Sequence, residues 1–545
     1  MRTGLLALCG VVAWMALADM PRMSLRLRGP HTATAEQWGK TFQAIKSNPG
    51  CCDEVWFSTG IGVPPLAWHQ ERAAYLVQIA TDLRRLGIQP GLQIQATLGH
   101  GDSLSGLEDC SAKNWTGWTG ETGVEDKYCN CPRQAGFLAY VRGMARAYAA
   151  FRPSSAWIDD DLRIGNHRPA TDRSFVGCWC ATCVAAFNAE TGGRWTRETL
   201  AVARKADAEL SARWKCFADA GIAAVAAAIA EEFHKVSPMT RLGYQHSFAP
   251  SHLETVRTVV AALRKVGGKV GLRPGGGYYY DVNPSQQVIK SLMAARFQGL
   301  YGDTDEVDVW CPEVESWPRT YGGRSAQSVL VESFSAFMYG LNATSMLILD
   351  TRYEEDALYS RTLLKPLADA APVLLGYVRT NDGAQPVGYA VPKELANDAL
   401  YKFALTGIPV LPGVGRSLAA LTAADCKLDI CSRGSKDIQQ VRDALDARAG
   451  GAPAVVTSPF VGLMVPQVAV ADGALRTVAL LNTRIDVQGP VSLRLRAVPK
   501  ETKKAVWRAL RGVPVEVPLV RTGNVVQVEI PEIGTWNAGY LAFDD

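Results

Sequence analysis

The sequence predicts an α/β fold: a TIM (β/α)8 barrel followed by a flavodoxin-like α/β domain and a C-terminal β-sandwich. Short apolar strands alternate with helices from Met23 to about Ala370, and polar residues gather where these strands end. Short β-rich runs dominate from Ala454 onward. The chain has 545 residues, which is too long for one hydrophobic core, so we expect two to four domains.

The predicted barrel strands are short apolar runs separated by stretches with helical periodicity. The strands are expected at Ser24–Leu27, Glu54–Ser58, Gly91–Ala96, Ala156–Asp160, Arg241–His246, Val270–Arg273, Val307–Glu315 and Ser345–Asp350. Helices are expected between them, for example at Leu76–Leu86, Gln134–Phe151, Ala208–His234, Leu253–Val266 and Ala326–Gly340. Eight strands alternating with helices are typical of a TIM barrel, and an open doubly wound sheet is the alternative.

The remaining chain divides by its texture into further units. The residues from Pro386 to Ala452 contain a strand-like Val387–Val391 and a helix at Ser435–Arg448, as in a small flavodoxin-like unit. Strands are then expected at Val461–Val465, Thr477–Leu481, Val491–Leu495, Val525–Ile530 and Tyr540–Phe543. We therefore predict a barrel over residues 19–375, a flavodoxin-like domain over 376–455 and a β-sandwich over 456–545.

The N-terminus reads Met1-Arg2-Thr3 and continues with an apolar run from Gly4 to Ala18. A short cationic start, an apolar stretch and a small-x-small end are typical of a secretory signal peptide, so residues 1–18 predict a secreted or periplasmic protein. A buried N-terminal strand or helix is the alternative. No stretch is long enough for a comfortable membrane span.

The composition excludes several classes of protein. Hydrophobic residues make up 48% and charged residues 20%, so the chain is not mostly disordered. The net charge is only +4 and no basic block occurs, which argues against a nucleic-acid partner. No nucleotide-binding motif is present either, so we expect no organic cofactor.

Carboxylates at two distant strand ends suggest glycoside hydrolysis, which needs an acid and a nucleophile or base. The first group is Asp159-Asp160-Asp161, where mutual repulsion should raise a pKa or require Arg163 as a partner. The alternative is a structural acidic turn. The second group is Glu313 and Glu315, which share one face of a strand that ends before Pro318. One of them could instead form a salt bridge with Arg273.

Five cysteines form two tight groups that are typical of metal ligation. Cys178, Cys180 and Cys183 supply three thiols within six residues, and Cys129 or Cys131 can supply a fourth. Four thiolates make a closed structural zinc site, although disulfides are the alternative in an exported chain.

These same segments resemble the family-42 β-galactosidases. The resemblance covers Trp157–Asp161, the cysteine loop from Gly177 to Phe187 and Tyr128-Cys129-Asn130-Cys131-Pro132. It implies a retaining, exo-acting β-glycoside hydrolase with a structural zinc, a trimer assembled through the flavodoxin-like domain and a glycoside substrate. Glu315, three residues before Pro318, matches the family's nucleophile. Where the family has Asn-Glu at the fourth strand, this chain has Asp160-Asp161, and the shorter carboxyl sits about 1–1.5 Å further back.

We therefore predict Asp161, Glu315, Asp160 and Glu313 as catalytic candidates. Further strand-end and loop residues could bind sugar: Arg26, His100, Asn166, His167, Tyr244, His246, Arg273, Tyr278, Trp310 and Trp317. Two alternatives remain open at this stage. One is a non-catalytic carbohydrate-binding barrel that has lost its acid, and the other is an inverting hydrolase with more widely spaced carboxyls.

Overall fold

The computed structural model describes residues 22–95, 97–99, 109–163, 176–281, 285–302, 305–316, 323–349, 360–392, 397–428, 430 and 434–544. Several positions named from the sequence lie outside these residues: the predicted signal peptide, His100, Asn166, His167, Trp317, Pro318 and Asp350.

The N-terminal part contains a parallel sheet with the order β10-β11-β1-β2-β3-β6-β7-β8-β9. Its strands are β1 (Met23–Leu27), β2 (Glu54–Ser58), β3 (Gln89–Ile94), β6 (Ser155–Ile158), β7 (Arg241–Ser247), β8 (Val270–Gly275), β9 (Val307–Trp310), β10 (Glu313–Glu315) and β11 (Thr344–Leu347). Each lies on a predicted strand. The predicted alternation of strand and helix is confirmed.

The two ends of this sheet are parts of one predicted strand. β9 pairs with β8, and β10 pairs with β11, yet only Cys311 and Pro312 separate β9 from β10. Pro312 has no backbone N–H and cannot donate to the ladder. Because β9 and β10 are the two outer strands of the sheet and only two residues join them, the sheet curls back on itself at this break, which gives a TIM-like α/β fold.

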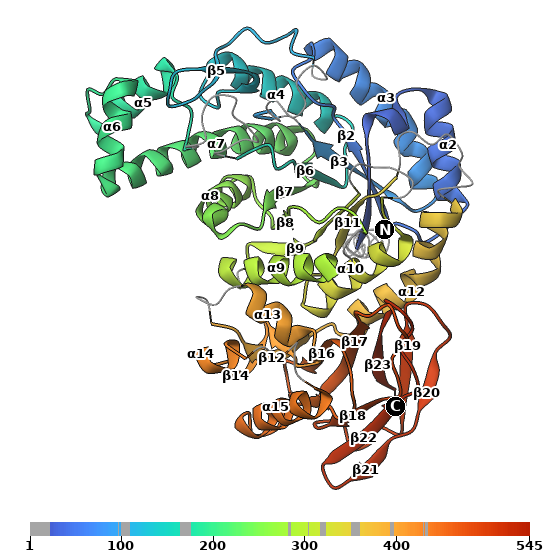
Figure 1. Cartoon of the computed structure of the whole chain (residues 1–545). Coiled ribbons are helices and arrows are strands. Elements are labelled where there is room, and N and C mark those ends of the chain that lie inside the picture. The colour runs from blue at the N-terminus through green and yellow to red at the C-terminus, as the bar shows by residue number, and fades with distance from the viewer. Residues whose placement is uncertain are drawn as a thin grey trace, which may run out of the picture.

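Helices cover the outside of the sheet (Figure 1). They are α2 (Ala35–Lys46), α3 (Leu66–Arg85), α4 (Ala135–Ala149), α5 (Ala181–Thr191), α6 (Arg197–Ala206), α7 (Ala208–Val236), α8 (Leu253–Arg264), α9 (Ser285–Tyr301), α10 (Ala326–Met338) and α12 (Lys365–Thr380). The short hairpin of β4 (Gly117–Thr119) and β5 (Glu125–Asn130) belongs to the long connection after β3. Every residue of α10 except Gln327 is buried, because this helix lies between the barrel and the C-terminal part.

Several predicted boundaries of barrel strands differ from the structure by one to three residues, and one of these differences lies at the candidate site. The predicted strand Ala156–Asp160 ends at Ile158, so the acidic residues lie in a turn rather than in the strand. The Asp159 side chain accepts the backbone N–H of Asp160 at 3.0 Å, and this local bond replaces a ladder bond.

The C-terminal part contains an eight-stranded mixed sheet and a four-stranded sheet. Its helices are α13 (Asn397–Ala404), α14 (Ala423–Cys426) and α15 (Ser435–Arg448). Its strands are β12 (Ala384–Ala390), β13 (Val410–Leu411), β14 (Arg416–Ala420), β15 (Ala454–Val456), β16 (Gly462–Ala469), β17 (Leu475–Asn482), β18 (Val491–Leu495), β19 (Lys504–Ala509), β20 (Val515–Val517), β21 (Val520–Thr522), β22 (Val525–Ile530) and β23 (Ala538–Asp544). β12 pairs in antiparallel fashion with β16, so a single sheet spans the predicted boundary at residue 455. The division into a flavodoxin-like domain and a β-sandwich stays a prediction.

The barrel packs closely against the C-terminal sheet. Gln467 of β16 donates to the Met338 carbonyl of α10 at 2.8 Å and to the Tyr377 hydroxyl of α12 at 3.0 Å. The rings of Tyr377 and Tyr540 lie 5.2 Å apart. Within the described ranges, no helix is both long and apolar enough to cross a membrane.

Candidate active site and metal centre

An apolar layer fills the part of the barrel interior that lies nearer the amino-terminal ends of the strands. The side chains of Trp56 and Trp157 stack at 4.7 Å, and Val309, Cys311 and Ala343 complete this layer. The tryptophans fit because the neighbouring strands carry glycine at the same level. A Cβ atom on Gly243 would lie 2.2 Å from the Trp157 ring. The layer is a packed core, so a substrate can reach the barrel interior only from one of its two ends.

Above this layer lies a closed ring of polar side chains, which we call the interior ring. It consists of Arg26, Gln93, Asp159, Arg273 and Glu313. Arg26 donates to Gln93 at 3.1 Å, Gln93 donates to Asp159 at 3.0 Å, and Asp159 lies 3.5 Å from Arg273. Arg273 pairs with Glu313, which lies 3.9 Å from Arg26. Apart from Gln93 of β3 and Asp159, which directly follows the neighbouring strand β6, the residues in contact come from strands that are not paired with each other, so these contacts cross the barrel interior.

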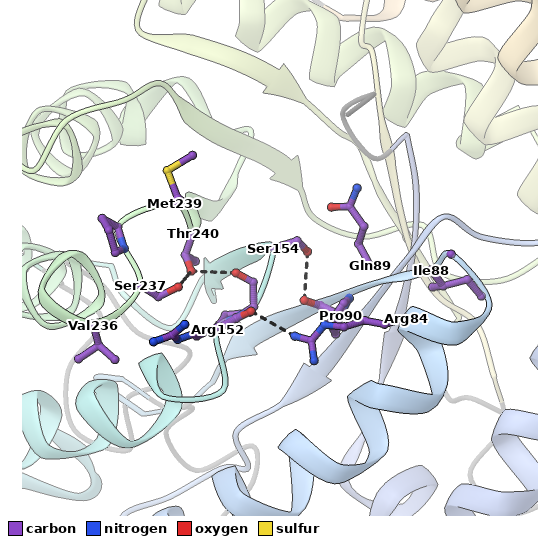
Figure 2. Close-up of a pocket in the computed structure, with 13 residues that line it drawn as sticks. Arg84, Ile88, Gln89, Pro90, Arg152, Ser154, Val236, Ser237, Met239 and Thr240 are labelled. Atoms are coloured by element: carbon purple, nitrogen blue, oxygen red, sulfur yellow. Dashed lines mark hydrogen bonds between the residues drawn. The ribbon is translucent and has the colours of Figure 1, made fainter. Parts of the chain in front are cut away.

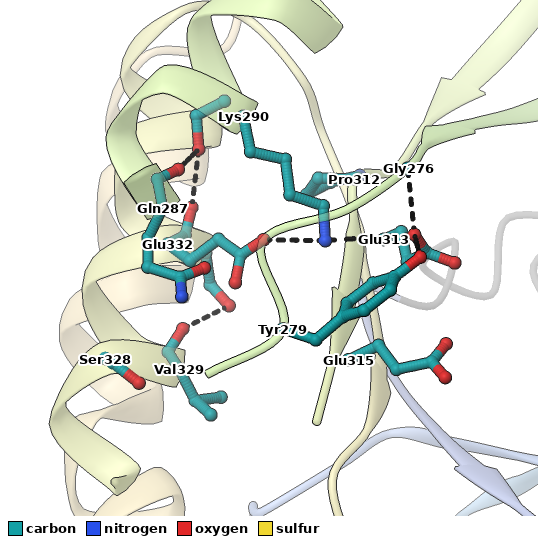
Figure 3. A network of polar contacts seen from close by, with 12 residues as sticks. Gly276, Tyr279, Gln287, Lys290, Pro312, Glu313, Glu315, Ser328, Val329 and Glu332 are labelled. Atoms are coloured by element: carbon teal, nitrogen blue, oxygen red, sulfur yellow. Dashed lines mark hydrogen bonds and ion pairs between the residues drawn. The ribbon is translucent and has the colours of Figure 1, made fainter. Parts of the chain in front are cut away.

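Glu313 is buried, and Figure 3 shows its carboxylate beside Gly276 and Tyr279, with Lys290 nearby. One of its oxygens pairs with Arg273, and the other accepts the Gly276 backbone N–H at 2.9 Å and the Tyr279 hydroxyl at 3.1 Å. Lys290 Nζ lies 3.8 Å from the second oxygen. Burial raises the pKa of Glu313, but the charges of Arg273 and Lys290 outweigh it and hold the pKa below its usual range. The sequence left open whether Glu313 or Glu315 forms a salt bridge with Arg273, and in the structure Glu313 forms it.

Asp159 is the buried member of the acidic turn. Its carboxyl accepts from the side-chain amides of Gln93 at 3.0 Å and Gln95 at 3.3 Å. Burial, together with the neighbouring carboxylates of Asp160 and Asp161, raises the pKa of Asp159 to about 6. The sequence predicted a raised pKa in this cluster, and the pKa of Asp159 is raised.

The other carboxylates differ sharply in exposure. The Asp160 side chain is 24% exposed and lies 3.7 Å from Arg163, the partner expected from the sequence. Asp161 is completely buried. The Glu315 side chain is 13% exposed and lies 3.3 Å from Arg26. Asp160 and Glu315 are thus the more accessible carboxylates at the two predicted strand ends.

Tyr279 lies beside the glutamates of β10, because its hydroxyl donates to Glu313. Burial raises the pKa of its hydroxyl most strongly, and the negative charges of Glu313, Glu315 and Asp160 raise it further. Such electrostatic effects require groups that lie near one another. The acidic turn after β6 and the glutamates of β10 both lie at the carboxyl ends of the barrel strands, and Glu313 is the one that contacts the Tyr279 hydroxyl, at 3.1 Å.

The predicted sugar-binding residues fall into two groups. Arg26 and Arg273 belong to the interior ring, and half-buried Tyr278 has a left-handed backbone next to Tyr279. Tyr244, His246 and Trp310 do not line this site.

Those three side chains point into the layer between sheet and helices. Tyr244 donates to the Leu162 carbonyl, His246 packs on Phe297 at 4.5 Å, and Trp310 packs on Tyr301 at 5.7 Å. The alternation along β7 turns Gln245 inward instead, where it accepts from Arg273 at 2.9 Å.

Several residues of the site were missed from the sequence. They are Arg28, Gln93, Gln95, Gln245, Tyr279, Lys290 and Arg324. Gln93 and Gln95 alternate at the end of a barrel strand, which is the pattern that could have identified them. Lys290 and Glu332 interrupt otherwise buried helices, and a charge in such a helix indicates a buried ion pair.

A pocket of about 640 Å³ lies at the opposite, amino-terminal end of the barrel (Figure 2). No carboxylate contributes to its described lining, and several of its polar groups already bond to one another. The Thr240 hydroxyl donates to the Pro153 carbonyl and lies 2.8 Å from the Ser237 hydroxyl. Without paired carboxylates, this pocket does not fit glycoside hydrolysis.

Four cysteines converge in a buried cluster that could hold a metal ion: Cys131, Cys178, Cys180 and Cys183. Their sulfur atoms all lie within 4.8 Å of one another. Cys131 Sγ lies 3.4 Å from that of Cys183 and 3.6 Å from that of Cys180, too far for disulfide bonds. The cluster selects Cys131 as the fourth member, and Cys129 lies outside it.

Comparison with solved structures supports the fold, whereas comparison with known sequences finds no relative. No family model matches the sequence, and no curated protein sequence matches it. A GH42 β-galactosidase from G. stearothermophilus superposes with a TM-score of 0.58 at 9% identity, covering 97% of this chain and 98% of the other. The β-galactosidase from Bacillus circulans sp. alkalophilus gives a TM-score of 0.56 at 11% identity, covering 94% and 99%. That from the psychrophilic Marinomonas ef1 gives 0.52 at 9% identity, covering 96% and 100%. Over nearly its whole length, the chain is therefore similar in structure to the β-galactosidases that its cysteine loop resembles.

Proposed function

We propose that this protein is a retaining, exo-acting β-glycoside hydrolase. One observation carries the proposal: Asp159 and Glu313 share Arg273 as a partner, and this brings the acidic turn after β6 and strand β10, which also carry Asp160 and Glu315, together across the barrel interior. Glycoside hydrolysis needs such a pair of carboxylates on either side of one glycosidic bond. The similarity in fold to enzymes described as β-galactosidases supports the same class of activity.

Asp160 is the proposed acid/base and Glu315 the proposed nucleophile. Both side chains are partly exposed, whereas Asp161 is fully buried. The alternatives Asp159 and Glu313 have their carboxylate oxygens occupied by donors of the interior ring and neighbouring groups. Because a carboxylate with its lone pairs engaged is a poor nucleophile, we assign these two residues to positioning.

The chemistry proceeds in two steps. Asp160 protonates the glycosidic oxygen while Glu315 attacks the anomeric carbon, so the leaving group departs as an alcohol and a glycosyl ester forms on Glu315. Asp160, now ionised, takes a proton from water as the water attacks the same carbon and releases Glu315. Arg26, 3.3 Å from Glu315, stabilises its charged form.

We further infer that the four-cysteine cluster binds a structural zinc ion. Zinc–thiolate bonds of about 2.3 Å in a tetrahedron place the sulfurs about 3.8 Å apart, close to the separations observed here. The backbone N–H of Thr119 points to Cys178 Sγ at 3.3 Å, and such a donor suits a thiolate ligand. With four protein ligands the ion has no open position, so it would tie loops together and take no part in hydrolysis.

Substitution of single carboxylates tests the assignment. We expect Asp160→Asn to lower kcat by about two to four orders of magnitude, because general acid catalysis contributes about that much. The loss should be smaller on aryl glycosides with acidic leaving groups, which need no proton. Glu315→Gln should abolish turnover on all of these substrates while the circular dichroism spectrum stays unchanged.

Asp161→Asn is the matched control for Asp160→Asn, since the two residues are neighbours of the same type. A larger loss in Asp161→Asn, with Asp160→Asn fully active, would transfer the acid role to Asp161. Full activity of Glu315→Gln would contradict the proposed function.

A further inference from the structure

Lys290 is a buried cation beside the proposed active site. Its side chain is 1% exposed and stands on α9 between the buried Val288 and Leu292. Burying an ammonium group costs several kcal/mol unless opposite charges surround it. The partners of Lys290 therefore show what this residue is for.

The ammonium group lies between two carboxylates (Figure 3). Glu332 of α10 is 3.3 Å away, and Glu313 of the interior ring is 3.8 Å away. The group also lies over the Tyr279 ring, 4.9 Å from its centre. Lys290 thus contacts a residue of the interior ring and the tyrosine that bonds to it.

A second cation connects the far side of this network to the end of β10. Arg324 pairs with the buried Glu332 at 2.6 Å and donates to the backbone carbonyl of Glu315 at 3.0 Å. The contacts therefore run from Glu313 through Lys290, Glu332 and Arg324 to Glu315. Both ends of this network lie on the strand that carries the proposed nucleophile.

Arg26 divides its contacts between the two glutamates of β10. Arg26 lies 3.3 Å from Glu315 but 3.9 Å from Glu313. Without Lys290, Glu313 would lose one of its positive neighbours and attract Arg26 more strongly. Arg26 would then stabilise the ionised form of Glu315 less well.

We propose that Lys290 is a positioning residue that keeps Glu313 charged and in place, so that Arg26 remains on Glu315. This inference rests on the proposed function. The charged and titratable groups around Glu313 and Lys290 are Arg26, Asp159, Asp160, Arg273, Tyr279, Glu315, Arg324 and Glu332.

The test compares Glu332→Gln with the double variant Lys290→Met/Glu332→Gln. In this pair no unpaired Glu332 charge remains to disturb folding. We expect the acidic limb of the kcat/KM profile to lie about one pH unit higher in the double variant, since a nearby opposite charge shifts a carboxyl pKa by at least that much. We also expect kcat to fall by about 10- to 100-fold with KM nearly unchanged, because a buried lysine touches no substrate.

Two further variants complete this design. The single variant Lys290→Arg should keep the acidic limb of the kcat/KM profile close to that of the wild type, whereas the single variant Lys290→Met should shift it to higher pH. Lys235→Met removes a lysine that pairs with the buried Glu232 at 2.9 Å, far from the barrel interior, and should leave the profile unchanged. Superimposable profiles of Glu332→Gln and the double variant would overturn the proposal, because Lys290 would then serve only to neutralise Glu332.

Melting temperatures give a readout that needs no activity. The deficit of the double variant relative to Glu332→Gln should be larger at pH 7 than at about pH 3, because the stabilisation is lost only as the pH falls through the lowered pKa of Glu313, where protonation removes its ion pair with Lys290. An equal deficit at both pH values would contradict a contact between the two charges. A wild-type protein that hydrolyses no glycoside would defeat the proposed function, while the melting temperatures would still decide whether Lys290 acts on Glu313.

Discussion

Glu313 and Glu315 lie two residues apart on one face of a strand, yet their surroundings assign them different chemistry. Glu313 is enclosed by Arg273, Tyr279 and Lys290, whereas Glu315 is partly exposed and lies next to Arg26. A fully bonded carboxylate fixes the geometry of its neighbours, and an accessible one can react. Exposure and partners, rather than residue type, separate the two roles.

His246 provides a test at the same scale, because burial lowers its pKa to about 3. The unfolded state takes up a proton near pH 6.5 and the folded state does not, so the free energy of unfolding falls as pH decreases below about 6.5. This residue alone should remove about 2 kcal/mol at pH 5. In His246→Leu the loss between pH 7.5 and pH 5, measured by urea unfolding, should be smaller by about that amount.

The exposed His234 on α7 supplies the control for this measurement. His234→Gln should keep the wild-type pH dependence. If His246→Leu lost as much stability on acidification as the wild type, the histidine would not be buried in its neutral form.

The sequence could place the carboxylates at strand ends but not choose their partners. Pairing between Arg273 and Glu313 depends on which side chains meet across the barrel, and no local pattern encodes this. The same limit explains Tyr244 and His246. Strand β7 was predicted correctly, but the sequence does not reveal which alternate face, that of Gln245 or that of its neighbours, turns inward.

At the scale of elements, the two long connections after β3 and β6 meet at the cysteine cluster. Cys131 lies between β5 and α4, while Cys180 caps α5. The sequence predicted that the two connections come together at these cysteines, because three of the four cysteines lie close together in the chain. It could not choose between Cys129 and Cys131, since both lie near the start of the same helix.

Removal of one ligand tests the metal centre. Purified wild-type protein should contain about one zinc ion per chain, as expected for a four-thiolate site. Cys180→Ser should lose the metal and melt at a lower temperature, as determined by elemental analysis and calorimetry. Cys216→Ser, which removes an exposed cysteine of α7, is the matched control and should change neither. Metal-free protein with fewer titratable thiols than cysteines would favour disulfides instead.

The strand pattern of the barrel was more predictable than its breaks. Apolar β-rich runs identified every barrel strand, because the interior of a parallel sheet demands them. The interruption at Cys311 and Pro312, and the early end of β6 before Asp159, depend on individual hydrogen bonds. These two irregular positions lie directly before Glu313 and Asp159, the two proposed positioning carboxylates.

At the scale of the whole molecule, the barrel and the C-terminal part form a continuous packed body. The buried α10 contacts Lys290 and Arg324 through Glu332, and it contacts the C-terminal sheet through the Met338 carbonyl. The proposed catalytic strand is therefore supported from outside the barrel as well as from within. Trimer formation and export remain predictions from the sequence.

The account as a whole depends on one reaction: covalent capture of a sugar by Glu315. A 2-deoxy-2-fluoro aryl β-glycoside, made from the sugar that the enzyme hydrolyses fastest, should slow the second step and leave a stable adduct. Intact mass spectrometry should show the addition of one glycosyl group, and peptide mapping should locate it on Glu315. Normal turnover without any adduct would indicate inversion, and an adduct on Glu313 or another residue would contradict the assignment of the nucleophile.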